Sequence, residues 1–200
     1  KNNYDRYRMN NVKEAIDILK KGGIVIFPTD TAYGMGCRMD DEKAVERLFS
    51  LRRRPQHQAT PVLVSSRSMA EKYLRSPLPD NVRRLCDTYW PGGVTVIYHC
   101  RIEKVPPLVR GGGTTLGVRM PDHKIPLALI HEVGIPLLGP SANFHGEKTP
   151  YTYTDLDRNL LKLVDLVIRG ECNSKLASTV VDCTKNPFQI LREGAVKVNV

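Results

Sequence analysis

The stretch that decides the fold is Gly22-Gly23-Ile24-Val25-Ile26-Phe27-Pro28-Thr29-Asp30-Thr31. Its two glycines end a helix predicted over residues 12–21, which Asn10 or Asn11 can cap and whose apolar residues recur at helical spacing. The four apolar residues that follow are typical of a short strand buried on both faces. The stretch therefore predicts a helix, a buried strand and a loop, in that order.

The rest of the chain alternates between helices and strands, until consecutive strands at the C-terminal end imply some antiparallel pairing. No repeat, low-complexity linker or clear boundary interrupts this pattern, so we expect one domain over residues 1–200. The predicted fold class is α/β, with a twisted open mixed parallel/antiparallel sheet and flanking helices. We expect helices at 41–51, 68–75, 80–89, 125–133 and 154–163, strands at 61–64, 94–98, 115–119, 136–138, 166–168, 178–182 and 188–191, and a loop at 28–36.

The composition is that of a globular protein with an excess of positive charge. The chain is 41% hydrophobic and 26% charged, and its formal net charge is +9. This excess favours anionic partners: nucleotides, nucleic acid or acidic surfaces. The five cysteines form no CxxC pair, the histidines are scattered, and no apolar run approaches the ~20 residues that span a bilayer. We expect a soluble cytoplasmic protein with no membrane contact, whose thiols serve packing.

A run of arginines, Arg52-Arg53-Arg54-Pro55, stands where the helix at 41–51 must end. Proline cannot continue that helix, and it pushes Arg54 out of the α region. One interpretation is a solvated basic helix end, which the helix dipole favours slightly. The other is a clamp for a polyanion such as a nucleoside triphosphate, because the guanidinium fork suits phosphate oxygens.

Polar and cationic residues follow several other predicted strands. The loop at 28–36 carries Thr29, Asp30 and Thr31, and the loop after the strand at 136–138 carries Ser141 and Asn143. Each could be an ordinary turn or helix cap. Arg119, Ser178 and Arg192 stand at further strand ends, where open α/β sheets collect ligands. Together they predict a positively charged pocket, in which we expect cations and hydroxyls to gather but not carboxylates.

Six motifs occur in the order seen in YrdC/TsaC-like proteins, which the chain resembles over about residues 12–194. They are Gly22–Gly34, Arg52-x-Arg54-Pro55, Trp90-Pro91-Gly92-Gly93-Val94-Thr95, Gly117-Val118-Arg119-Met120-Pro121, Pro140-Ser141-Ala142-Asn143 and Ser178-Thr179-Val180-Val181-Asp182. The resemblance implies a YrdC-like sheet around a deep basic concave cavity. It also implies a threonylcarbamoyl-AMP synthase, a nucleotidyltransferase that combines L-threonine, bicarbonate and ATP, with Mg²⁺, to give threonylcarbamoyl-AMP and pyrophosphate.

The resemblance also implies the site residues. Arg52 and Arg54 would be catalytic, at the phosphates, and no protein side chain is assigned to the metal. The residues expected at the threonine or carbamate are Thr29, Thr31, Ser65, Arg119 and Ser178. Those expected at ATP or the adenylate are Arg52, Arg54, Gln56, Thr115, Ser141, Asn143 and Arg192. Two positions depart from the family pattern: Arg52 stands where lysine is usual, and Ser65 where some members carry histidine.

Further partners are also implied by the resemblance. The product would pass to a downstream threonylcarbamoyl-transfer complex that modifies adenosine 37 of tRNA. Two alternatives remain open. One is an RNA-binding YrdC-like module, in which the net charge of +9 holds a tRNA or double-stranded RNA backbone. The other is a diverged relative that binds adenylates but does not catalyse this reaction. The arginine at position 52, where lysine is usual, keeps this alternative open.

Overall fold

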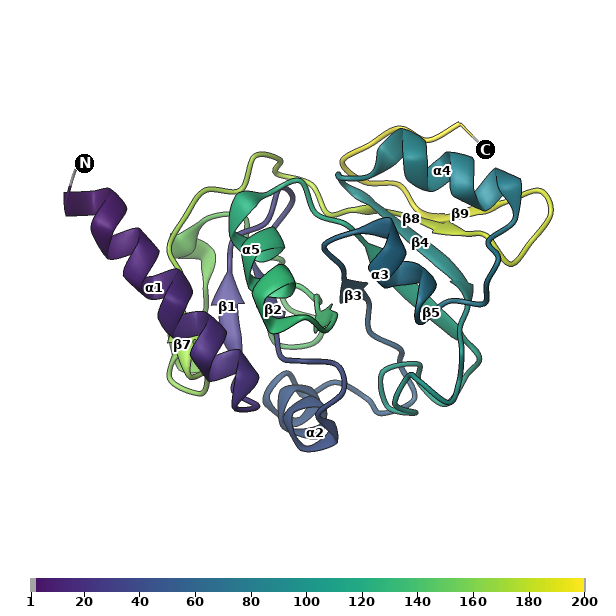
Figure 1. The fold of residues 1–200 in the computed structure, drawn as a ribbon. Helices are drawn as coiled ribbons and strands as arrows, with labels where there is room; N and C mark the ends of the chain where they lie inside the picture. The colour runs from purple at the N-terminus through teal and green to yellow at the C-terminus, as the bar shows by residue number, and fades with distance from the viewer. Residues whose placement is uncertain (1–2, 200) are drawn as a thin grey trace.

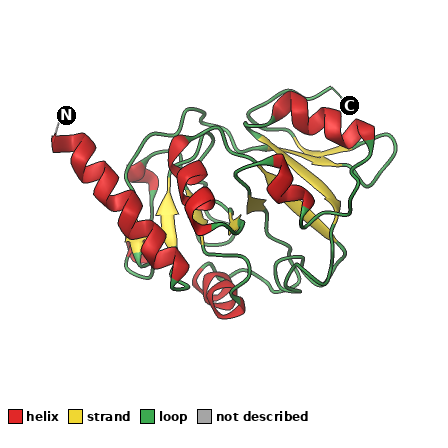
Figure 2. Ribbon diagram, in the orientation of Figure 1, coloured by secondary structure: helices red, strands yellow, loops and turns green. Residues whose placement is uncertain are grey.

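The computed structural model describes residues 3–199, with side chains from residue 11 onward, and holds two β-sheets with helices around them (Figure 1 and Figure 2). The helices are α1 Asn3–Lys20, α2 Glu42–Leu51, α3 Arg67–Glu71, α4 Asp80–Tyr89, α5 Lys124–Val133, the 3₁₀ turn η1 Tyr153–Asp155, and α6 Arg158–Leu161. The strands are β1 Val25–Phe27, β2 Gly34–Gly36, β3 Val62–Leu63, β4 Val94–His99, β5 Thr115–Arg119, β6 Leu137–Leu138, β7 Leu166–Val167, β8 Thr179–Asp182 and β9 Gln189–Arg192.

The smaller sheet has the order β2-β1-β7, and β1 is its centre. This strand runs antiparallel to β2 and parallel to β7. Val25 and Phe27 pack into a cluster with α1 and α5, which lie side by side over this sheet (Figure 1), while Ile24 and Ile26 belong to the cluster that includes α2. All three residues of β1 are buried, which confirms the prediction of a strand enclosed on both faces.

The larger sheet has the order β6-β3-β5-β4-β8-β9 and mixes both pairings. Parallel pairs join β3 to β5 and β4 to β8, whereas β3–β6, β4–β5 and β8–β9 are antiparallel. Helix α4 packs on this sheet through Val82, Leu85 and Cys86 (Figure 1). The antiparallel pair β8–β9 confirms what the consecutive C-terminal strands predict, and the fold class is the expected α/β class.

The two sheets meet where β2 faces the segment that follows β6. Backbone hydrogen bonds join Met35 N–H to the Pro140 carbonyl at 2.9 Å and Ala142 N–H to the Tyr33 carbonyl at 2.8 Å. A bridge between Gly34 and Ser141 lies in the same place. The predicted open sheet is thus divided in two, and the two loops with the richest polar content are held side by side at the division.

Three expected helices differ from those observed. The helix expected at 68–75 is the shorter α3, which ends at Glu71 with its C-cap at Lys72. Helix α1 begins at Asn3, not after a cap at Asn10 or Asn11, because no glycine or proline interrupts residues 3–10. The single helix expected at 154–163 is two short pieces, η1 and α6. In η1, Asp155 accepts a hydrogen bond from Thr152 N–H at 2.8 Å, which caps this short turn. Asp157 is the N-cap of α6.

The loop expected at 28–36 is also partly wrong, because its last three residues form β2. Gly34-Met35-Gly36 has no apolar alternation to predict a strand. The strand exists because β1 offers a partner and because glycine fits the space. A Cβ at Gly36 would lie 2.8 Å from both the Leu138 carbonyl oxygen and a Phe27 ring carbon. Any side chain there would push β2 away from β1 or from β6.

The cysteines are free thiols, four of them buried and Cys172 half-buried. Burial raises the pKa of Cys86 and of Cys183 to about 12, so both stay protonated at neutral pH and pack as small apolar groups, as expected. Among the described residues, no helix is both long and apolar enough to cross a bilayer.

Asp165 joins three elements and supplies a pH-dependent prediction. Its carboxylate accepts Ile24 N–H at 2.8 Å and Arg47 Nη1 at 2.5 Å, and the Arg47 hydrogen bond lowers the pKa of Asp165. We expect Asp165→Asn to lower the free energy of unfolding by about 1 kcal/mol at pH 7. A lowered folded-state pKa stabilises only above the unfolded value of about 4, and this contribution disappears as pH falls through the folded value.

Urea unfolding of Asp165→Asn and of the wild type at neutral and at acidic pH measures this effect. Asp122→Asn is the matched control, because Asp122 is an exposed carboxylate. The gap between Asp165→Asn and the wild type should close in acid. A gap that stays constant with pH would contradict an ionic contribution from Asp165.

Candidate anion-binding site

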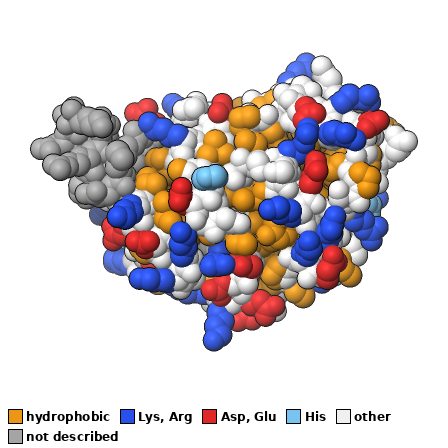
Figure 3. Space-filling view, in the orientation of Figure 1, with side chains coloured by type: hydrophobic (Ala, Val, Ile, Leu, Met, Phe, Trp, Pro, Cys, Tyr) orange, Lys and Arg blue, Asp and Glu red, His pale blue; other side chains and the backbone are white. Residues whose placement is uncertain are grey.

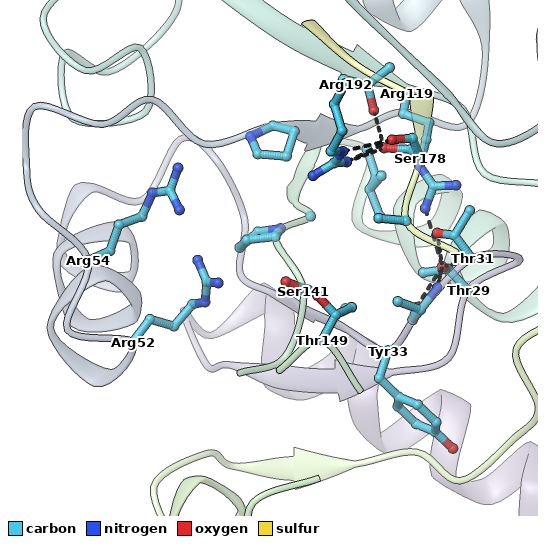
Figure 4. Close-up of a pocket in the computed structure, with 18 residues that line it drawn as sticks. Thr29, Thr31, Tyr33, Arg52, Arg54, Arg119, Ser141, Thr149, Ser178 and Arg192 are labelled. Carbon is cyan, nitrogen blue, oxygen red and sulfur yellow. Dashed lines mark hydrogen bonds between the residues drawn. The ribbon is translucent and has the colours of Figure 1, made fainter. Parts of the chain in front are cut away.

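A pocket opens between the two sheets, at the junction of β2 with the segment after β6 (Figure 4). Its lining is mainly hydroxyl and guanidinium groups with a few small apolar residues, and it includes no Asp or Glu side chain. The lining residues are Thr29, Thr31, Ala32, Tyr33, Gly34, Arg52, Arg54, Pro61, Leu63, Thr95, Arg119, Gly139, Pro140, Ser141, Thr149, Ala177, Ser178 and Arg192. The pocket therefore has the positive, hydroxyl-rich character that the strand ends predict.

The end of α2 aims two arginines at this pocket and one away from it. Arg53 N–H donates to the Ser50 carbonyl at 3.0 Å and Arg54 N–H donates to the Phe49 carbonyl at 2.9 Å, which is the Schellman pattern of a helix C-terminus. Arg53 takes the left-handed position of that pattern, with φ of 54°, where glycine is usual. The reversal of chain direction places Arg52 and Arg54 toward the pocket, as Figure 4 shows, and leaves Arg53 exposed over the ring of Phe144 at 4.5 Å.

This geometry predicts how Arg53 responds to substitution. A non-glycine residue pays about 1 kcal/mol or more for the left-handed conformation. Arg53→Gly and Arg53→Ala both lose the contact with Phe144, but only the glycine variant loses the backbone strain. We expect Arg53→Gly to be more stable than Arg53→Ala by about 1 kcal/mol in urea unfolding. Equal stabilities would show that the backbone at Arg53 is not strained.

Arg52 is buried with an unused donor. Only 3% of the residue is exposed, its Nε donates to the Asn143 carbonyl at 3.0 Å, and its Nη1 has no hydrogen-bond partner among residues 3–199. Burial and the nearby charge of Arg54 lower the pKa of Arg52 to about 10, so it remains a cation at neutral pH. A buried cation with an unsatisfied donor at a pocket wall is a candidate for binding an anionic ligand.

Arg54 is held by its own loop. Its Nε donates to the Gln58 carbonyl at 3.2 Å, and its Nη2 donates to the Ala59 carbonyl. These bonds restrict the guanidinium to one side of the loop that leads into β3. Burial lowers the pKa of Arg54, and no described carboxylate pairs with Arg54 to oppose that shift. Arg52 and Arg54 thus form a fixed, uncompensated pair of cations.

Arg119 is balanced by the carboxylate of Asp30, a pairing that the sequence does not predict. Its Nη1 lies 2.8 Å from Asp30 Oδ1, and its Nη2 donates to Thr29 Oγ1 at 3.2 Å. The side chains of Arg119 and Asp30 are 6% and 10% exposed. Burial lowers the pKa of Arg119, and the carboxylate of Asp30 opposes that shift. The expectation that carboxylates stay away from the strand ends is therefore wrong at Asp30, which stands behind the pocket wall.

A hydroxyl cluster stands beside Arg192 at the same end. Arg192 donates from Nε and Nη2 to the Ser178 carbonyl, at 3.0 and 2.8 Å, and from Nη2 to Ser178 Oγ at 3.0 Å. The hydroxyl of Ser178 lies 2.9 Å from that of Thr95. Burial lowers the pKa of Arg192. These bonds join β4, β8 and β9 and orient the hydroxyl of Ser178.

The fold brings most of the predicted site residues together, while their chemical roles remain predictions. Those that line the pocket are Thr29, Thr31, Arg52, Arg54, Arg119, Ser141, Ser178 and Arg192. Those outside the lining are Ser65, Gln56, Thr115 and Asn143.

Local geometry explains these four exclusions. Ser65 Oγ lies 3.9 Å from the Met69 sulfur, and Gln56 is exposed in a turn. Thr115 begins β5, at the opposite end from Arg119. Asn143 donates to two backbone carbonyls, those of Phe144 and Glu147, and reaches the site only because its own carbonyl accepts from Arg52.

Sequence reasoning missed several lining residues. Thr95 closes the Trp90–Thr95 motif, so its place in a motif was the available signal. Thr149, Pro61, Leu63 and Ala177 carry no local signal, because only the packing of distant segments brings them to the pocket.

Comparison with known proteins identifies the family. The Sua5/YciO/YrdC family model, described as "Telomere recombination", matches residues 17–194. The threonylcarbamoyl-AMP synthase of Bacillus subtilis is 33% identical over 92% of this chain and 54% of its own length. The structure of Pyrococcus abyssi Sua5 complexed with L-threonine has a TM-score of 0.84 at 31% identity, covering 92% of this chain and 54% of that one.

A relative of similar length also matches. The crystal structure of Escherichia coli YciO has a TM-score of 0.83 at 29% identity, covering 93% of this chain and 90% of that one. The chain thus spans about half the length of the Bacillus and Pyrococcus relatives and most of YciO. On the family match and these identities, the chain belongs to the Sua5/YciO/YrdC family, as its ordered motifs predict.

Proposed function

We propose that this chain is a threonylcarbamoyl-AMP synthase, which joins L-threonine, bicarbonate and ATP and releases pyrophosphate. The observation that carries the proposal is the buried, unsatisfied guanidinium of Arg52 beside Arg54 in a hydroxyl-lined pocket. The names of relatives support it: one of 33% identity is a threonylcarbamoyl-AMP synthase, and a similar structure was solved with L-threonine.

The chemistry needs charge and positioning more than a protein nucleophile. The threonine nitrogen would first form a carbamate with bicarbonate, with loss of water. A carbamate oxygen would then attack the α-phosphorus of ATP, the bond from that phosphorus to the bridging oxygen would break, and pyrophosphate would leave. Both reactants are anions, so repulsion and misorientation are the main obstacles. Arg52 and Arg54 are suited to neutralise the phosphates, because neither has a carboxylate partner in the described part of the chain.

The other end of the pocket would take the amino acid. Thr29, Thr31 and Ser178 offer hydroxyl groups, and Arg119 offers its remaining N–H groups to a carboxylate. Ser141 lies between the two ends and would contact the adenylate, as would Arg192 from across the pocket (Figure 4). In this arrangement threonine and the triphosphate would enter from different sides and meet near Ser141.

The lining residues alone do not provide a magnesium site, because none of them is a carboxylate. We propose that Mg²⁺ arrives with ATP, held by phosphate oxygens and water. The residues that surround it would then act through hydroxyl groups and positive charge, and no step of the reaction is assigned to a protein-bound metal.

The test is pyrophosphate release in mixtures of the protein with ATP, bicarbonate and one amino acid at a time. Release that requires both L-threonine and bicarbonate is the expected result. Serine and valine are the informative competitors, because each lacks one of the two groups on the threonine β-carbon. Release with no amino acid, or equally with all of them, would contradict the proposal.

A second candidate is an adenylate-binding relative that does not perform this reaction. Two observations favour it: the chain matches most of the length of Escherichia coli YciO, whose name states no activity, and Arg52 stands where the family resemblance leads us to expect lysine. The same assay separates the two candidates. ATP binding without threonine-dependent pyrophosphate release would support the second.

Contact with RNA is a weaker proposal. On the face that Figure 3 shows, lysine and arginine side chains are interspersed with aspartate and glutamate around an apolar area, rather than joined in one basic surface. We propose instead that the product passes to a separate threonylcarbamoyl-transfer complex acting on adenosine 37 of tRNA. A salt titration of tRNA binding tests the alternative, since phosphate contacts give a steep loss of affinity with salt.

A further inference from the structure

Four arginines line the pocket, and they lie in two groups at opposite ends. Arg52 and Arg54 stand at one end, and Arg119 and Arg192 stand at the other, as Figure 4 shows. Polyphosphates bind wherever several guanidinium groups converge. With arginines alone, the pocket would offer a triphosphate two similar ends.

One carboxylate distinguishes the ends. Asp30 is paired with Arg119 at 2.8 Å, and no described Asp or Glu is paired with Arg52, Arg54 or Arg192. Asp30 does not line the pocket; its side chain is paired with Arg119 and is 10% exposed. It therefore changes the charge of one end without occupying any of the space that a ligand needs.

The carboxylate is also rigidly placed. Thr29 Oγ1 accepts a hydrogen bond from Arg119 Nη2. The backbone carbonyl of Asp30 accepts a hydrogen bond from Ser174 N–H at 2.9 Å. The segment that leads to Ser178 is thereby tied to the same loop. Charge compensation at this end is therefore built into the fold, between the loop after β1 and the end of β5.

We propose that Asp30 sets the polarity of the pocket: it cancels the charge of Arg119 so that polyphosphate binds at Arg52 and Arg54 and the opposite end is left for a zwitterion. With Arg119 compensated, Arg192 is the one lining arginine at this end that no described carboxylate pairs with, against two at the other end. An amino acid carries one carboxylate and one ammonium group, so the less charged end accepts it more readily than it accepts pyrophosphate. Asp30 is in this sense a specificity-determining residue that acts through Arg119.

The first test uses pyrophosphate alone as the probe, so it does not depend on the proposed reaction. Titration calorimetry is expected to show that Arg52→Met weakens pyrophosphate binding by about 10-fold or more. Adding Asp30→Asn to Arg52→Met is expected to recover about 10-fold, because Arg119 then becomes an uncompensated cation. A gain of binding distinguishes this role from a purely structural one, since damage to the fold lowers affinity.

Asp40→Asn in the same Arg52→Met background is the matched control. Asp40 is a carboxylate paired with Arg38 at 2.7 Å, but the pair is exposed and lies outside the pocket lining. It should recover no binding. Adding Arg119→Gln to the Asp30→Asn variant should abolish the recovery. If Asp30→Asn restores no more than Asp40→Asn, or if circular dichroism shows that it unfolds the chain, the proposal is overturned.

The second test rests on the proposed function. In the single variant Asp30→Asn, pyrophosphate should compete with L-threonine, raising its apparent Kd about 10-fold more than it does in the wild type. Asp30→Glu keeps the charge and should behave as the wild type does. If the competition with L-threonine fails while the pyrophosphate titration succeeds, the role of Asp30 is retained and threonine is rejected as the ligand. Failure of the first arm overturns the role of Asp30 whatever the reaction is.

Discussion

Arg119→Met is expected to lower the free energy of unfolding by about 3–5 kcal/mol, because it leaves the Asp30 carboxylate buried without its partner. Methionine fills a volume close to that of the arginine stem, so the loss measures charge compensation rather than a cavity. A domain of this size has about 5–15 kcal/mol of stability, so the variant should be partly unfolded well below the melting temperature of the wild type. Chemical unfolding followed by circular dichroism measures the difference.

The control for this prediction is the exposed pair of Arg38 with Asp40, which has a similar separation of 2.7 Å. Arg38→Met should cost about 1 kcal/mol or less, because solvent screens that pair. The double variant Arg119→Met with Asp30→Asn should recover part of the loss, since it removes both buried charges. Equal costs for Arg119→Met and Arg38→Met would contradict the burial argument.

Arg52→Met is expected to separate stability from binding. The variant removes a buried cation whose Nη1 has no partner in the described chain, and it loses one hydrogen bond to the Asn143 carbonyl. These effects oppose each other, so we expect the free energy of unfolding without ligand to change by about 1 kcal/mol or less. Pyrophosphate release, in contrast, should fall by about 10²-fold to 10³-fold, the usual cost of losing one stabilising donor in a transition state.

Two measurements check this separation: thermal unfolding with and without ATP, and the rate of threonine-dependent pyrophosphate release. ATP should raise the melting temperature of the wild type by more than it raises that of Arg52→Met. Arg52→Lys, which restores the residue usual in the family, should retain most of the activity because it keeps the charge. Near-normal turnover in Arg52→Met would remove Arg52 from the site.

Local sequence signals predicted several elements because each signal acts over a few residues. The unbroken apolar run at 24–27 predicts β1, and helix α4 occupies the predicted 80–89. The sequence did not predict β2, because Gly34-Met35-Gly36 becomes a strand only by pairing with β1 and with the segment after β6. The sequence did not predict the division into two sheets for the same reason, since pairing between distant segments leaves no local pattern.

The candidate site divides in the same way. The sequence by itself determined that the helix before Pro55 ends in arginines. It also determined that Thr29 follows a strand, that Arg119 ends one and that Ser178 stands where another begins, because such boundaries depend on adjacent residues. Only the tertiary structure decided that Asp30 compensates Arg119 and not Arg52, and that Thr95 stands against Ser178. Residues 30 and 119 are neighbours because two separate sheets meet beside the pocket, and an electrostatic pairing of that range depends on distance in space rather than on distance along the chain.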